Sequence, residues 1–465
     1  MPDDSSTTVA VNAPAEGGGG RRASRGSVMF RALRYRHFQL FFSGQLSSLI
    51  GTWMDNIAEA WLVYRLTGSS LLLGTVAFAG QIPVFLLAPL GGMVADRWDR
   101  RKVVIATQTS SMILAGILAA LTLSGRVKVW EVVVLAALMG VVNAFDIPAR
   151  QAFLVEMVGR EDLMNGIALN SSMFNGARVI GPAIAGILVA SIGEGWCFFA
   201  NSVSYIAVIA GLLLMRMGPR EVKEQFASAI EHIAEGFRFV RHTAPIWALL
   251  LLLGVVSLVA MPYSVLMPVF AAKILHGNAR TLGELMGATG IGALTGALVL
   301  ASRTGLQGLS RWVANSCAGF GVALILFSFS PWRIVSIILL VPVGFSMMVQ
   351  MASSNTLIQA MVPDRLRGRT MAVYSMMFMG MAPLGSLLAG AIADRIGAQW
   401  TVALGGLGAI AGAFFFSRRL PRLRVEAREL ILAQGLAGGE PAGNMTGRAL
   451  EVRQDVSRAE PSHYE

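Results

Sequence analysis

Three ionisable side chains interrupt long apolar stretches of the chain: Asp55, Glu59 and Arg178. Asp55 and Glu59 are four residues apart, so they share one face of a helix. At about 1.5 Å per residue, Asp55 would lie roughly 15 Å deep, near the middle of a ~30 Å apolar layer, with Glu59 shallower. Arg178 also falls near the middle of its own stretch. Because a charge in such a layer costs several kcal/mol, these residues are candidates for function.

The chemistry open to these three residues is reversible proton binding. A carboxylate in a dry site is easier to bury when it is protonated, and a nearby guanidinium favours its ionised form. We therefore predict that Asp55 or Glu59 binds a proton and that Arg178 sets its affinity. The alternative is a fixed ion pair that holds two helices together.

Such residues need apolar helices to position them, and the composition predicts a protein built from such helices. Of the 465 residues, 54% are hydrophobic and 14% are charged, and the mean hydropathy is +0.61. Soluble domains carry about 25% charged residues. We expect an all-α membrane protein, with twelve transmembrane helices in two six-helix bundles. The predicted spans are 38–64, 71–93, 103–123, 130–153, 163–193, 196–215, 246–272, 282–301, 312–329, 333–360, 370–394 and 398–416.

Basic residues decide the expected orientation. With a cytoplasmic N-terminus, 27 Lys and Arg residues fall in inner segments and 7 in outer loops. Cytoplasmic loops carry an excess of Lys and Arg, so we expect both termini in the cytoplasm and the chain in the plasma membrane. The net charge of +11 could also attract nucleic acid. We do not expect that partner, because the basic residues are spread over many short loops.

The expected domain organisation has five parts. Residues 1–33 form a polar N-terminal tail, 34–216 the first bundle, 217–244 a linker, 245–420 the second bundle and 421–465 a C-terminal tail. Apolar residues recur along the linker in steps of four and three: Phe226, Ile230, Ile233, Phe237 and Val240. This spacing predicts an amphipathic helix, which would lie either on the inner membrane surface or against neighbouring protein.

An internal repeat supports the two bundles. At an offset of 204 positions, residues 158–193 align with 362–397 without a gap, with 11 identities among the 36 pairs. Glycines let membrane helices pack closely, so their shared spacing indicates a shared packing surface. We expect the fifth and eleventh spans to be structural equivalents, in a duplicated architecture typical of transporters. The aligned glycine pairs include Gly176/Gly380, Gly181/Gly385, Gly186/Gly390 and Gly193/Gly397. Arg178 and Pro182 instead align with Ala382 and Ser386.

The loop after the second span reads Gly92-x-x-x-Asp96-Arg97-x-x-Arg100-Arg101. Together with twelve spans, this loop resembles the best-known motif of the major facilitator superfamily. The runs 148–156 and 170–182 are similar to the bacterial subgroup of the enterobactin exporter and the macrolide-efflux proteins. The resemblance covers about residues 30 to 420. It implies that two bundles rock about a central site and that a proton gradient drives transport.

The same resemblance implies roles for two sets of residues. The loop, with Gly92, Asp96, Arg97, Arg100 and Arg101, would form a cytoplasmic gate in which Asp96 and Arg97 latch the bundles together. We expect Arg150 to be the partner of Asp96 and Asp99 to cap the third span. At the repeat offset Asp96 falls on Leu300, so the latch would be one-sided and would stabilise the outward-facing state.

The glycine-rich run in the fifth span partly matches the antiporter motif of the superfamily. Its helix-bending residues are Gly176, Gly181, Pro182 and Gly186, and Ala185 stands where the motif has a glycine. This resemblance favours antiport.

Several uncharged polar residues and methionines also lie within the predicted spans. Such side chains either hydrogen-bond between helices or line a cavity. Methionines adapt to varied apolar ligands, although packing within the protein is the explanation we favour. The candidate cavity-lining residues are Asn143, Asn175, Gln350 and Asn355, and the methionine-rich stretch runs over 371–381.

Other classes of protein lack support in the sequence. The two cysteines, Cys197 and Cys317, lie far apart, and no cysteine or histidine spacing indicates a metal site. Without a phosphate-binding loop or a nucleophilic triad, we expect neither an enzyme nor a cofactor. The expected partners are protons, lipid and a small-molecule substrate, with the chain as a monomer. The leading prediction is proton-coupled export of small amphipathic molecules, either drugs or a siderophore-like metabolite. An uptake symporter and a membrane sensor are the alternatives.

Overall fold

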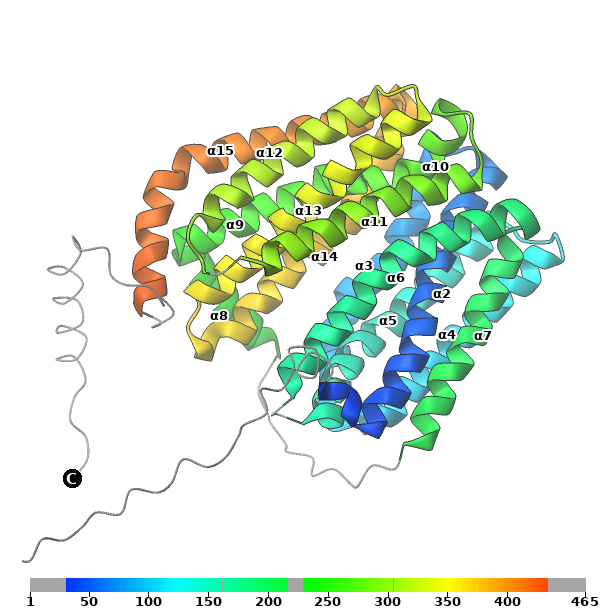
Figure 1. The fold of residues 1–465 in the computed structure, drawn as a ribbon, viewed down its shortest axis with the longest axis horizontal. Helices are drawn as coiled ribbons and strands as arrows, with labels where there is room; N and C mark the ends of the chain where they lie inside the picture. The colour runs from blue at the N-terminus through cyan, green and yellow to red at the C-terminus, as the bar shows by residue number, and fades with distance from the viewer. Residues whose placement is uncertain (1–30, 160–161, 216–228, 304, 434–465) are drawn as a thin grey trace, which may run out of the picture.

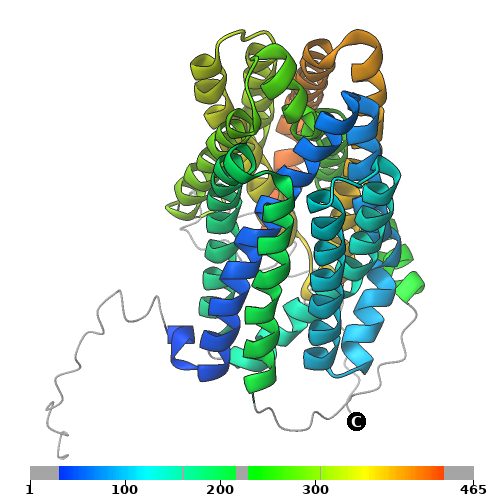
Figure 2. The ribbon, with the colours of Figure 1, turned by 90° about the vertical axis from the view of Figure 1, so that its right-hand side faces the viewer.

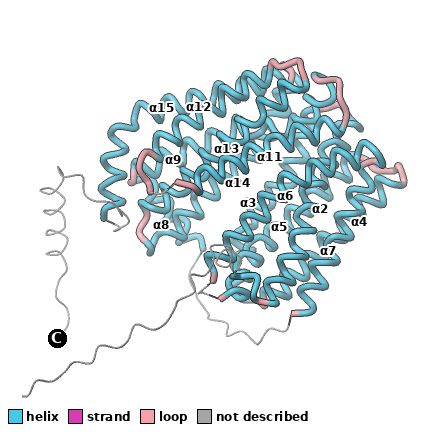
Figure 3. The backbone as a smooth tube through the Cα atoms, viewed as in Figure 1, coloured by secondary structure: helices cyan, strands magenta, loops and turns pink. Residues whose placement is uncertain are grey.

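The computed structural model describes residues 31–159, 162–215, 229–303 and 305–433, and these residues contain helices and no strand (Figure 1; Figure 3). Twelve long helical segments correspond to the twelve predicted spans, six in each bundle. The first bundle contains α2 (Arg36–Thr67), α3 (Ser70–Arg97), α4 (Arg100–Leu123), α5 (Val129–Val158), α6 (Leu163–Ile192) and α7 (Glu194–Leu214). The second contains a broken segment from Ala244 to Ile274, then α11 (Ala279–Ala301), α12 (Leu309–Ser328), α13 (Arg333–Met361), α14 (Asp364–Ile396) and α15 (Ala398–Ala433).

Eleven of these segments, within the part of the chain described, are long and apolar enough to cross a membrane. The remaining one is α2, which has 32 residues and ample length. Its hydropathy is lowered by polar side chains along its middle, among them Asp55 and Glu59. In the bundle this helix packs along α6 and α7 (Figure 2), and its polar side chains line an internal cavity.

The seventh span is broken because two prolines interrupt it. α9 (Ala244–Val255) is followed by a π-helical turn over Val256–Ala260 and a 3-10 turn over Met261–Leu266. A short α10 (Met267–Val269) and a second π-helical turn over Phe270–Ile274 complete it. Proline lacks a backbone N–H and clashes with the preceding turn, so Pro262 and Pro268 prevent a regular helix here.

Two other segments refine the sequence-based boundaries. α8 (Ala229–His242) lies in the predicted linker and packs against α14, where Arg369 forms an ion pair with Glu235. The expected amphipathic helix therefore lies against neighbouring protein. Its first predicted apolar residue, Phe226, is outside the described residues. α15 continues to Ala433, past the boundary predicted at 420, and Pro421 lies inside it.

The repeat corresponds to equivalent contacts in the two halves. Gly193 and Gly397 end α6 and α14 with φ of 89° and 90°, a backbone conformation that favours glycine. A Cβ on Gly181 would lie 2.5 Å from Trp53 Cβ, and one on Gly385 would lie 2.2 Å from the Leu258 carbonyl oxygen. Each glycine thus lets its helix approach the first helical segment of its own bundle.

The next aligned pair, Gly186 and Gly390, joins the two bundles. A Cβ on Gly186 would lie 3.0 Å from Gly283 Cα on α11, and one on Gly390 would lie 3.2 Å from Gly74 Cα on α3. The backbones of α6 and α11, and of α14 and α3, therefore meet directly across the bundle interface.

We call the end of the molecule that carries Arg36, Arg97 and Arg418 the basic end, and the opposite end, with the α2–α3 and α14–α15 connections, the distal end. The bundles lie together at the distal end and diverge toward the basic end, at the lower left of Figure 1. The contacts at Gly186 and Gly390 lie in the distal half.

Candidate functional site

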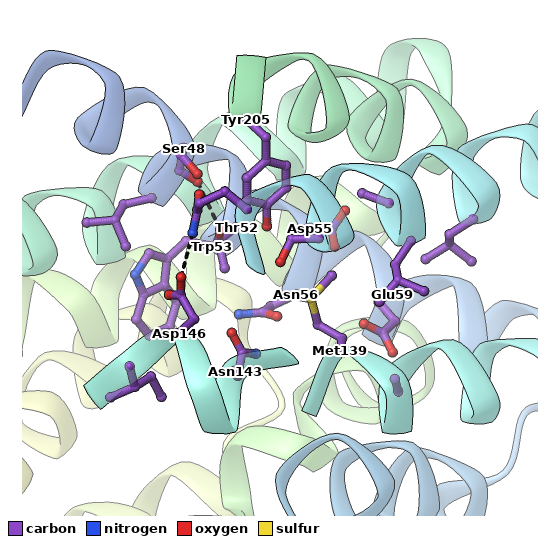
Figure 4. Close-up of a pocket in the computed structure, with 18 of the residues that line it drawn as sticks. Ser48, Thr52, Trp53, Asp55, Asn56, Glu59, Met139, Asn143, Asp146 and Tyr205 are labelled. Atoms are coloured by element: carbon purple, nitrogen blue, oxygen red, sulfur yellow. Dashed lines mark hydrogen bonds between the residues drawn. The ribbon is translucent and has the colours of Figure 1, made fainter. Parts of the chain in front are cut away.

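A cavity of about 290 Å³ lies inside the first bundle. Its wall comes from α2, α4 and α5, with Phe174 of α6 and Tyr205 of α7. The polar part of the wall includes a stripe on α2 with spacings of four, three and four: Ser48, Thr52, Asp55 and Glu59. Figure 4 shows these side chains facing Asn143 and Met139 of α5.

The two predicted proton-binding residues therefore line the same cavity. Asp55 is buried, and its Oδ1 has no hydrogen-bond partner. Asn201 and Tyr205 of α7 lie beside it. Within the described residues, neither Asp55 nor Glu59 forms an ion pair. The cavity wall thus holds two carboxylates without a counter-ion.

A third carboxylate, Asp146 of α5, lies at the other end of the cavity and is fully partnered. Its Oδ2 is 2.6 Å from Arg150 Nη2, one helical turn along α5. Its Oδ1 accepts hydrogen bonds from Thr107 Oγ1 at 2.8 Å and from Gln108 Nε2 at 2.9 Å, both on α4. Ion pairs buried with complete hydrogen bonding keep their charges in place. Asp146 was not among the residues predicted from the sequence, although an Asp and an Arg four residues apart near the end of an apolar span were a usable signal.

Arg150 therefore does not pair with Asp96, and that expectation is wrong. Asp96 instead lies 3.6 Å from Arg100 on its own bundle, and its side chain is 78% exposed.

Arg178 does not line the cavity. Its guanidinium carbon is 5.7 Å from the centre of the Trp53 ring, and Nη2 is 4.0 Å from Met347 Sδ on α13. Trp53 itself lines the cavity. The structure thus separates Arg178 from Asp55 and Glu59 and places it at the interface with the second bundle.

In the predicted gating loop, Arg100 and Arg101 make hydrogen bonds within the first bundle, whereas Asp96 and Arg97 are exposed. Arg100 donates hydrogen bonds to the carbonyls of Ala95 and Ala152 and to Glu156, and Arg101 donates to the carbonyls of Leu212 and Leu213 at the end of α7. These two residues tie the loop to its own bundle. Asp96 and Arg97 are exposed, and a Cβ on Gly92 would meet nothing within 4 Å.

Asp99, which follows the gating residues Asp96 and Arg97, caps the N-terminus of α4. The Asp99 side chain accepts a hydrogen bond from the Lys102 N–H at 3.2 Å, which confirms the predicted cap of the third span.

The remaining candidates lie at several places. Asn143 lines the cavity. Asn175 lies outside it and donates to the Ser171 carbonyl at 2.8 Å, and Asn355 accepts from Gln359 at 3.0 Å in the second bundle. Gln350 is buried in the second bundle, and its side-chain atoms have no hydrogen-bond partner. Of the glycine-rich run, Gly181 and Gly186 make the close contacts described above, whereas Gly176 meets nothing within 4 Å.

Twelve helical segments in two bundles, with a polar cavity between apolar helices, define a multi-pass membrane transporter with the major facilitator fold. The same fold occurs in a crystal structure of a POT family transporter in complex with 5-aminolevulinic acid. The TM-score is 0.69 with 10% identical residues, over 84% of this chain and 97% of that one. At that identity the likeness concerns the fold alone.

Sequence comparison gives the family. Residues 27–434 match the model of a major facilitator family described as transmembrane secretion effector, and the chain belongs to that family. Two similar relatives are the staphyloferrin A transporter of Staphylococcus aureus and the multidrug efflux pump Tap of Mycobacterium tuberculosis. The first is 27% identical over 83% of this chain and 97% of its own length, and the second is 30% identical over 87% and 97%. The resemblance noted in the sequence is confirmed.

Proposed function

We propose that the chain exports small amphipathic molecules that carry a positive charge, in exchange for protons. The observation that carries this proposal is the pair of carboxylates, Asp55 and Glu59, that line the 290 Å³ cavity and form no ion pair with another described residue. The charges of Asp146 and Arg150 offset each other. The cavity therefore has an excess of two acidic groups.

Such an excess supports exchange between a proton and a cation. An ionised carboxylate buried without a partner costs several kcal/mol, and either a proton or a bound cation removes that cost. Because both would bind the same oxygens, each would displace the other. Gradient-driven antiport requires such competition.

The rest of the wall supports an amphipathic substrate. Trp53, Phe174 and Met139 supply apolar and polarisable surface, and Asn143 supplies an amide with both a donor and an acceptor. Ligand sites commonly combine a largely apolar wall with a few polar groups that fix orientation. A flat or flexible apolar molecule with an amine or a quaternary nitrogen fits this description.

Arg178 has a proposed part in coupling rather than in proton affinity. Its guanidinium lies against Trp53, which lines the cavity, and near Met347 of the second bundle. A substrate that moved Trp53 would alter this contact between the bundles. We propose that Arg178 relays occupancy of the cavity to their relative motion.

The proposed orientation in the membrane rests on the distribution of Lys and Arg, and the proposed direction of transport rests on the named activity of a relative. The basic end carries most of the Lys and Arg, so we propose that it faces the cytoplasm, with both termini. The structure would then be the inward-facing form, with Asp96 and Arg97 released from the latch that the family resemblance implies. The efflux activity in the name of the relative Tap supports export. A monomer is proposed because one chain supplies the whole cavity.

Transport into inside-out membrane vesicles tests the proposal. With the vesicle interior acidified, ethidium, a cationic amphiphile, should accumulate, and collapse of the gradient with a protonophore should release it. Vesicles without the protein give the background. Transport of citrate but not ethidium would overturn the charge assignment. Ethidium movement in the opposite direction would indicate uptake, and no response to the gradient in either direction would indicate a sensor.

A further inference from the structure

The distal ends of α3 and α14 are joined by a carboxylate of one bundle at the helix N-terminus of the other. Asp394 Oδ1 accepts a hydrogen bond from the Ser70 N–H at 2.8 Å, and Oδ2 accepts one from the Ser69 hydroxyl at 3.0 Å. Ser69 in turn accepts from the Leu72 N–H at 3.3 Å. The first N–H groups of a helix have no partner within the helix and attract negative charge. Asp394 therefore caps α3 from across the bundle interface.

Glycine contacts one turn away keep this cap in position. A Cβ on Gly390 would lie 2.5 Å from the Ser70 carbonyl oxygen, and a Cβ on Gly74 would lie 2.4 Å from the Ser386 carbonyl oxygen. The two backbones thus touch where the cap forms. A small separation of α3 from α14 would break both the backbone contact and the hydrogen bonds.

The equivalent interface between α6 and α11 has the glycine contact without the cross-bundle cap. There the Asn278 side chain caps its own helix, accepting from the N–H groups of Arg280 and Thr281 at 3.0 and 3.4 Å. At the repeat offset of 204, Asp394 aligns with Ala190. The carboxylate is therefore a feature of only one of these two interfaces.

The sequence around Asp394 repeats that of the gating loop. Gly390-Ala-Ile-Ala-Asp394-Arg395 at the distal end of α14 has the spacing of Gly92-Met-Val-Ala-Asp96-Arg97 at the basic end of α3. The two helices run in opposite directions and pack together. One such run therefore lies at each end of the same helix pair. In this structure the distal one is engaged, whereas Asp96 at the basic end is exposed.

We propose that Asp394 is a distal latch, which holds α3 and α14 together while the basic end is open and releases them when the distal end opens. It opposes the gating loop on the same helix pair. Its loss should shift the conformational equilibrium toward the form that is open at the distal end. Removal of a side-chain helix cap changes an equilibrium by about fivefold.

Distances between spin labels at the distal end test the latch in purified protein in lipid nanodiscs. Arg126 on the first bundle and Trp332 on the second are exposed sites for the labels. Both native cysteines are buried and would be replaced by Ser. Asp394→Ala should increase the population with the long distal distance about fivefold. Asp394→Asn, which keeps an acceptor oxygen but loses the charge, should increase it about twofold.

Asn278→Ala is the matched control, because it removes a cap at the other distal interface that does not cross between the bundles. Its distance distribution should equal that of the parent protein. An unchanged distribution in Asp394→Ala would overturn the latch, as would an equal shift in Asn278→Ala. Should Asp394→Ala fail to fold, an unchanged distribution in Asp394→Asn would overturn it. The readout requires no transport, so it stands apart from the export proposal.

Discussion

Asp146 and Arg150 form an ion pair at 2.6 Å within one turn of α5, and Thr107 and Gln108 of α4 complete the hydrogen bonding of the carboxylate. Asp55, in the wall of the same cavity, has an oxygen with no partner. In the first bundle, therefore, Arg150 balances the charge of Asp146, whereas Asp55 has no counter-ion among the described residues.

Loss of Arg150 should destabilise the protein. Arg150→Ala leaves the Asp146 charge buried without its partner, which costs about 3 kcal/mol. The double variant Asp146→Asn, Arg150→Met removes both charges and should recover most of this loss. Thermal unfolding of the purified protein measures the effect, with Lys102→Ala as an exposed control. Equal melting temperatures for Arg150→Ala and the control would contradict the structural role of the pair.

Replacement of Asp55 should uncouple transport from the proton gradient. Asp55→Asn keeps the size of the side chain but cannot exchange a proton, so gradient-driven ethidium export should fall to background while the melting temperature is retained. Transport in proteoliposomes with an imposed gradient measures this. Glu131→Gln is the matched control, since Glu131 is a half-buried carboxylate at the start of α5 that does not line the cavity. Full export by Asp55→Asn would exclude Asp55 as the coupling site.

Neighbouring residues of the gating loop should give different phenotypes. Asp96→Ala removes an exposed side chain, so it should leave the melting temperature unchanged. It should increase the fraction of molecules open at the basic end, measured by cysteine accessibility. Arg101→Ala loses two hydrogen bonds to the end of α7 and should lower stability by about 1 to 2 kcal/mol. If Asp96→Ala left the accessibility unaltered, the loop would only mark topology.

A side chain at Gly186 should keep the distal end from closing. A Cβ there would lie 3.2 Å from the Ala279 carbonyl oxygen and 3.0 Å from Gly283 Cα, and the larger side chain of valine has no room. Gly186→Val should therefore abolish transport and favour the form open at the distal end. Gly287→Ala on α11 is the control, because a Cβ there meets nothing within 4 Å. Transport by Gly186→Val at the parent rate would show that this contact is dispensable.

Much of the fold could be predicted from the sequence, because its main determinant is local. Apolar runs of about 20 residues must form helices in lipid, since only hydrogen bonds within the helix satisfy the backbone there. The glycine spacing of the repeat likewise anticipated the matched contacts of Gly186 and Gly390. The end of α15 was harder to predict, because residues 417–433 are polar enough to resemble a tail.

The candidate site was predictable only where one helix supplied it. Asp55 and Glu59 share a face of α2, and their spacing alone places them together. The surroundings of Arg178 depend on how its helix is rotated within the bundle, which no spacing in one helix determines. Arg178 consequently lies against Trp53 and Met347 instead of the two acidic residues.

The polar stripe of α2 also has a consequence for synthesis in the cell. α2 is the first of the twelve segments to leave the ribosome, and it is the one that does not meet the apolarity expected of a membrane span. Acidic residues near the centre of a helix strongly disfavour its insertion into lipid by itself. α2 would then enter the bilayer stably only when α4, α5 and α7 are present, because these helices supply the rest of the cavity wall around its polar face. The acidic pair that we propose for exchange would therefore make biogenesis of the first bundle a cooperative event, completed after its sixth helix has been translated.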